Sequence, residues 1–218
     1  GGDSIHEWES GLTHLACDTQ GSAELAAAQH SEKMIWRLRA VANGLLPQLA
    51  WVADVDRAQG LVILVHGPRV EVRERFFIEG VWDGPFQLGE FGTTDCVFGS
   101  GGRLAEGSIR FVPSAATTDF LYYDEDGEHV RVSNSLPLLL AHTRDRLDPR
   151  CPDYSTICHS ILQGIHDYRR DIPTTGGTVR RLMYRNLEVS RDQVTELEKR
   201  LPPRFTSFAE YRDYLRDR

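Results

Sequence analysis

Residues 120–141, FLYYDEDGEHVRVSNSLPLLLA, decide the fold class of this 218-residue chain. The segments 119–124 and 129–133 are rich in aromatic and β-branched residues, which predicts two strands. The turn 124–127 between them ends in glycine and is typical of a β-hairpin. The leucine-rich run 136–142 that follows predicts a short helix. A hairpin followed directly by a helix indicates an α+β fold with an antiparallel sheet.

The flanking sequence adds further strands and helices to this unit. β-Rich runs divided by polar or glycine-containing turns predict strands at 48–55, 61–66, 70–78, 108–112 and 179–189. Apolar residues at helical spacing predict helices at 22–43, 154–168 and 207–218. Residues 83–102 are rich in Gly, Pro, Thr and Asp, which predicts a long loop or short strand pieces, with a flexible turn at 99–102.

The predicted organisation is one sheet domain with a segment on each side. A length of 218 residues, of which 40% are hydrophobic, suits a single folded domain with a substantial core. We expect a lead-in and helix at 1–46, the sheet domain at 47–201, and a linker with the start of a further helix at 202–218.

Charge and composition argue against several classes of protein. A formal net charge of −7 disfavours a broad nucleic-acid-binding surface, which needs a basic face. The longest apolar run, 61–65, is far below the ~20 residues of a membrane helix. The N-terminus lacks the basic start and apolar run of a secretory signal, so we expect a cytoplasmic protein without a membrane partner. Cys17, Cys96, Cys151 and Cys158 match no zinc spacing, which predicts reduced thiols and no metal site.

The quoted stretch resembles the amidotransferase half of asparagine-synthetase-like enzymes. In that family a strand ending in Leu-Tyr-Tyr, here 121–123, is followed by a glycine turn, a strand ending in a serine-containing step and a leucine-rich helix. The stretch 168–187 also fits, and FIEGVWD at 77–83 is faintly similar to a strand upstream. The resemblance covers the second half of the chain. It implies an antiparallel two-sheet sandwich of N-terminal-nucleophile (Ntn) type with flanking helices.

The chain departs from the family at both of that family's chemical sites. The family hydrolyses glutamine with an N-terminal cysteine whose own amine acts as the base, whereas this chain begins Gly1-Gly2. The arginine and Asn-Gly motifs that hold glutamine have no counterpart here. The family's pyrophosphate loop has the form Ser-Gly-Gly-x-Asp-Ser, and the nearest run, 100–105, has leucine and alanine where Asp and Ser should stand. The resemblance therefore implies a degenerate domain without glutaminase activity.

Two residues are candidates for contacts in the cavity that the resemblance implies. Arg103 follows a glycine run and is a candidate anion contact, although a surface arginine is the simpler interpretation. Asn134 follows the predicted hairpin and either faces the old substrate cavity or caps the next helix, and we favour the cap. The carboxylates at 124–126 lie in the hairpin turn and are expected to be solvated. No catalytic or cofactor-binding residue is predicted.

The function implied by the resemblance is support of an ATP-dependent amide-forming domain. In this hypothesis the partner is a synthetase-type domain or subunit, and it alone binds ATP and Mg²⁺. The chain ends near the point where the linker to such a domain would begin. The alternative is a stand-alone binding protein that uses the vestigial cavity for a peptide or small ligand. A third hypothesis is an enzyme whose internal nucleophile is released by self-cleavage, for example before Thr93 or Cys96.

Overall fold

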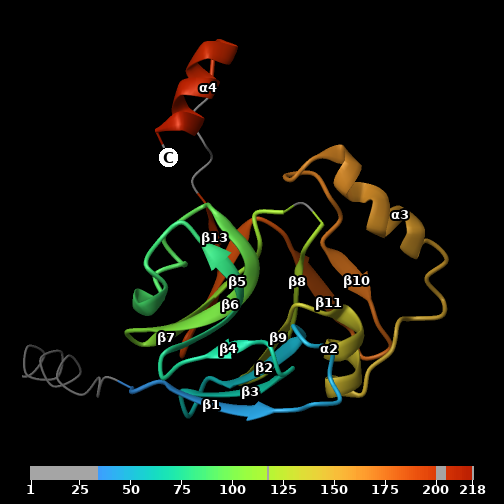
Figure 1. Ribbon diagram of the computed structural model, residues 1–218. Coiled ribbons are helices and arrows are strands. Elements are labelled where there is room, and N and C mark those ends of the chain that lie inside the picture. The colour runs from blue at the N-terminus through green and yellow to red at the C-terminus, as the bar shows by residue number, and fades with distance from the viewer. Residues whose placement is uncertain (1–33, 117, 200–204, 218) are drawn as a thin grey trace, which may run out of the picture. The chain divides into compact units, whose positions relative to one another are not determined.

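The computed structural model describes residues 34–116, 118–199 and 205–217. The chain divides into two units at Met34 and Ile35, and every element described below belongs to the second unit, Ile35–Arg218. Two β-sheets form the body of this second unit (Figure 1).

The larger sheet has seven strands in the order β1-β3-β2-β9-β8-β11-β10. Their bounds are β1 Arg37–Ala42, β2 Trp51–Asp56, β3 Leu61–His66, β8 Leu121–Asp126, β9 His129–Ser133, β10 Asp171–Pro173 and β11 Thr178–Leu182. Neighbouring strands run antiparallel, except that β1 pairs with β3 in parallel. The hairpin predicted at 119–133 is confirmed as β8 and β9, with Asp126 opposite His129.

The smaller sheet has six strands in the order β13-β12-β7-β6-β5-β4, all antiparallel. Their bounds are β4 Glu71–Val72, β5 Phe76–Trp82, β6 Val97–Ala105, β7 Ser108–Val112, β12 Arg185–Ser190 and β13 Val194–Glu198. The two sheets pack through their apolar inner faces. The fully buried Trp51 of β2 meets Phe77 of β5 with ring centroids 4.9 Å apart and stacks on Phe111 of β7 at 6.1 Å. The described unit is therefore a two-sheet α+β sandwich, as expected.

The described part of the unit also contains short helices. Their bounds are α2 Leu136–Thr143, α3 Tyr154–His159 and α4 Phe208–Arg216, with 3₁₀ turns η1 Phe86–Leu88 and η2 Ser160–Gln163. The predicted helix at 136–142 is confirmed as α2, whose Leu139 is fully buried in one cluster with Val52. Val52 alternates with the inward-facing Trp51, so α2 covers the outer face of the larger sheet. Within the described residues, no helix has the length and apolar character needed to span a membrane.

The helix predicted at 22–43 is wrong where the structure describes it. Residues 37–42 form β1, which joins the seven-stranded sheet, so the sheet begins before the expected boundary at 47. The earlier positions of that predicted helix, 22–33, lie outside the described residues. Without β1, the edge of β3 would present unpaired N–H and C=O groups. The backbone hydrogen bonds between β1 and β3 satisfy these groups, and they outweigh the helical preference that the spacing of a few apolar residues suggests.

The flexible turn predicted at 99–102 is instead the middle of β6. The glycines there permit a close approach of two strands. A Cβ built on Gly99 would lie 1.9 Å from the carbonyl oxygen of Glu79, and one on Gly80 would lie 2.0 Å from that of Phe98. In this strand, glycine allows two backbones to pack closely. Composition alone does not distinguish such a glycine-rich strand from a turn.

The strand predicted at 179–189 is two strands that lie in different sheets. β11 ends at Leu182, and β12 starts at Arg185 in the smaller sheet. Tyr184 between them has a φ of 56°, which turns the chain from one sheet to the other. The runs at 70–78 and 154–168 are likewise divided, into β4 and β5 and into α3 and η2, and β13 was not predicted.

Candidate functional site

A carboxylate, Glu79, lies on the inner face of the smaller sheet where the sandwich opens. It follows the inward-facing Phe77 by two residues, and side chains two apart on a strand share a face. Ser100, its partner across β6, also points inward, because its hydroxyl accepts a hydrogen bond from Trp51 Nε1 at 3.1 Å. A polar group therefore interrupts an otherwise aromatic core at this point.

Three hydrogen bonds converge on one oxygen of this carboxylate. Glu79 Oε1 accepts from the Ser100 amide at 2.8 Å, from the Ser100 hydroxyl at 2.6 Å and from Asn134 Nδ2 at 3.3 Å. Within the described residues no donor binds Oε2. Burial raises the pKa of Glu79 above its usual range, and the hydrogen bonds from Ser100 and Asn134 oppose this effect.

Asn134 connects the two sheets instead of capping a helix. Its Oδ1 accepts from the amide of Trp51 at 3.0 Å, and its Nδ2 donates to the carbonyl of Leu49 and to Glu79. The cap of α2 is the next residue, Ser135, whose hydroxyl accepts from the amide of Leu138. The preferred interpretation of Asn134 as a helix cap was therefore wrong. Asn134 and Ser135 have similar capping propensities, and here Ser135 caps α2 while Asn134 bonds to Trp51 and Glu79.

The inner face of the smaller sheet is uncovered beyond Glu79. Val81 is two residues further along β5, and Phe98 lies directly opposite it on β6. Their exposed fractions are 63% and 57%, whereas Phe77 on the same face is fully buried. The larger sheet therefore covers this face only as far as Glu79, and a carboxylate with an apolar pair beside it faces the open end.

Ser100 is not placed to act as a nucleophile, although it bonds a carboxylate. Its side chain donates to Glu79 and accepts from Trp51, and the residue is only 4% exposed. A nucleophile needs access to substrate as well as a base. The arrangement is suited to binding a ligand, and it offers no attacking group within the described residues.

Arg103 lies on the opposite face of the smaller sheet from this site. It pairs across β6 and β7 with Arg110, which binds Glu188, and its own guanidinium is 4.0 Å from Glu90. It lines a surface pocket of about 550 Å³ together with the loop residues Arg73–Phe76. The structure therefore does not bring Arg103 and Asn134 into one cavity.

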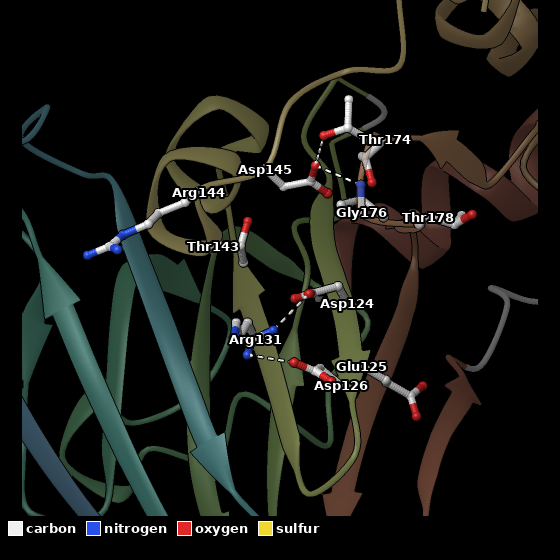
Figure 2. A pocket seen from close by; sticks show the side chains of 13 residues that line it. Asp124, Glu125, Asp126, Arg131, Thr143, Arg144, Asp145, Thr174, Gly176 and Thr178 are labelled. Atoms are coloured by element: carbon white, nitrogen blue, oxygen red, sulfur yellow. Dashed lines mark hydrogen bonds and ion pairs between the residues drawn. The ribbon is translucent and has the colours of Figure 1, made fainter. Parts of the chain in front are cut away.

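A polar pocket of about 460 Å³ lies beside the end of α2 (Figure 2). Figure 2 shows Arg131 next to Asp124 and Asp126, which its guanidinium binds at 3.0 and 3.3 Å. The expectation of a solvated Asp124 was wrong, because its side chain is 19% exposed and burial raises its pKa against the opposing charge of Arg131. The charged groups of this wall already bind one another.

On the opposite wall of that pocket, hydrogen bonds to Asp145 hold the turn between β10 and β11. Asp145 accepts hydrogen bonds from the hydroxyl of Thr175 at 2.6 Å and the amide of Gly176 at 2.9 Å (Figure 2). Burial alone would raise the pKa of Asp145, but hydrogen bonds from the threonines and nearby amides lower it to about 2. Because these groups hold the β10–β11 turn, we consider the pocket a poorer candidate site than the open end at Glu79.

Sequence reasoning missed Glu79, Ser100 and Trp51 as members of a site. In the sequence, Glu79 is one of the polar residues between or beside the apolar positions of the strand predicted at 70–78, and this alternation carries no sign of a site. Up to Glu79, both faces of β5 are covered, since Phe77 packs on Trp51 on the inner face and Phe76 and Ile78 pack with Phe91 on the other. In a strand that is apolar on both faces, a single carboxylate is the signal.

No group of three or more His, Cys, Asp or Glu residues able to hold a metal ion occurs in the described part of the chain. No known protein-family model and no curated protein matches this sequence.

Proposed function

We propose that this chain is a non-hydrolytic amidotransferase-type domain that supports an ATP-dependent amide-forming domain outside it. The support is the resemblance of residues 120–141 together with the two-sheet sandwich into which they fold. The proposed lack of hydrolysis rests on the geometry at Glu79. Among the described residues, the only hydroxyl that bonds this carboxylate is that of Ser100, and Ser100 is buried. ATP and Mg²⁺ belong to the partner in this proposal.

The test is a glutaminase assay on the purified full chain with glutamine at millimolar concentration. We expect ammonia release no faster than the buffer blank, and intact mass spectrometry should show one uncleaved species. Glutamine turnover, or two fragments produced by cleavage before Thr93 or Cys96, would contradict the proposal. A pyrophosphate-loop motif encoded shortly downstream of Arg218 would support this proposal, and a stop codon there would support a stand-alone binding protein.

A second candidate function is favoured by one specific observation. Val81 and Phe98 are more than half exposed on an inner sheet face, beside a carboxylate oxygen that no described donor binds. An uncovered apolar pair next to a fixed charge is a common composition for a small-ligand site. A stand-alone binding protein that uses this end of the sandwich would need no synthetase partner.

A further inference from the structure

The charge of Glu79 is not needed for the hydrogen bonds that it makes. Its three described donors, two from Ser100 and one from Asn134, all bind Oε1. The carbonyl oxygen of a glutamine could accept the same three bonds without the cost of burying a charge. A purely structural role therefore explains the bonds to Oε1, but it does not explain why this residue is a charged glutamate.

Among the described residues, the surroundings of Glu79 supply no cation to balance that charge. No lysine, arginine or histidine of the described chain forms an ion pair with it, and the charged neighbour that acts on it, Asp119, is also negative. Partly buried charges are stabilised when an opposite charge accompanies them. A cation that reached Oε2 from the open end of the sandwich would balance this charge.

The uncovered pair next to Glu79 indicates what the cation is attached to. Val81 and Phe98 form an exposed apolar surface on the same face, one cross-strand pair further toward the opening. An aliphatic or aromatic group would bury this surface, and the ring of Phe98 can also attract a cation through its π face.

We propose that the open end of the sandwich binds a small organic primary ammonium, with the ammonium on Glu79 Oε2 and an apolar substituent on Val81 and Phe98. This inference rests on the binding role proposed for this end of the sandwich and adds the chemical class of the ligand. An ammonium donates in three directions, so it matches an oxygen with free acceptor capacity beside fixed donors.

The experiment titrates the full chain with 2-phenylethylammonium chloride and measures the dissociation constant by calorimetry or by NMR shift changes. The uncharged 2-phenylethanol and ammonium chloride serve as matched probes, each lacking one half of the ligand. We expect saturable binding of 2-phenylethylammonium that is about tenfold or more tighter than binding of either matched probe.

Variants separate the proposed site from a structural effect. Glu79→Gln keeps an acceptor for the three donors, so it should melt no lower than the wild type while weakening binding about tenfold or more. Phe98→Ala should weaken the binding of 2-phenylethylammonium and leave the binding of ammonium chloride unchanged. Glu90→Gln on the opposite face is the control and should bind as the wild type does.

The proposal is overturned if folded Glu79→Gln binds as tightly as the wild type, if 2-phenylethanol binds as tightly as the ammonium, or if no saturation is seen. Ammonia release from glutamine is measured independently of these titrations. A failed titration with an inactive glutaminase assay therefore removes the amine site alone and leaves the amidotransferase-type proposal standing.

Discussion

Single residues in this sandwich carry charge into places that composition would assign to apolar side chains. Lys199 is 8% exposed, and its ammonium donates to the carbonyl of Pro113 at 2.8 Å and lies 5.5 Å from the centre of the Tyr184 ring. Burial lowers the pKa of Lys199 to about 8, against the opposing attraction of Asp95. Glu79 shows the same effect with the opposite sign, because burial raises its pKa.

Lys199 predicts a rise of stability with pH. Between a folded pKa of about 8 and an unfolded value of 10.5, the unfolded chain holds a proton that the folded chain has released. Because the unfolded state then binds more protons, the free energy of unfolding should increase from pH 8 to pH 10, by about 2 kcal/mol. Urea denaturation at both pH values measures this, and Lys199→Met should abolish the increase. An equal rise in the variant would show that another group is responsible.

At the scale of elements, glycines decide how closely β5 and β6 approach. Gly99 has a φ of 110°, and a Cβ there would lie 1.9 Å from the Glu79 carbonyl oxygen. Gly107, in the turn between β6 and β7, has a φ of 74° but nothing within 4 Å of a built Cβ. The two positions share a left-handed backbone and differ in the space around them. They therefore separate the cost of backbone strain from the cost of a steric clash.

We expect Gly99→Ala to cost about 3 kcal/mol or more and Gly107→Ala about 1 kcal/mol of unfolding free energy. Chemical denaturation monitored by far-UV circular dichroism measures both. Because the clash is with the backbone of Glu79, Gly99→Ala should also weaken the binding of any ligand at Glu79. Equal losses in the two variants would mean that strand proximity contributes nothing beyond the backbone conformation.

At the scale of the whole described unit, Trp51 is a central contact between the two sheets. It packs on Phe77 and Phe111 and donates its indole N–H to Ser100. Trp82, by contrast, packs with Phe86 on the outer face of the smaller sheet, and its buried Nε1 has no hydrogen-bond partner within the described residues. Removing the indole N–H should therefore have different consequences at the two sites.

Trp51→Phe should lower the free energy of unfolding by about 2 kcal/mol, through a lost hydrogen bond and a cavity between the sheets. Trp82→Phe should cost less, since it removes an unpartnered donor together with some packing. Urea denaturation followed by circular dichroism compares them without relying on tryptophan fluorescence. A greater loss for Trp82→Phe would contradict the central role given to Trp51.

The sequence by itself determined the local elements whose signals lie within a few residues. The β8–β9 hairpin, the strands at 61–66 and 108–112, and α2 follow from alternation, turn residues and a leucine-rich run, because each depends on contacts close in the chain. Tertiary structure alone decided that β1 is a strand, that β6 contains the glycine run, and that 179–189 divides between two sheets. It also decided that Asn134 joins Glu79 instead of capping α2. These outcomes depend on backbone and polar groups far apart in sequence that satisfy one another only once the sheets have packed.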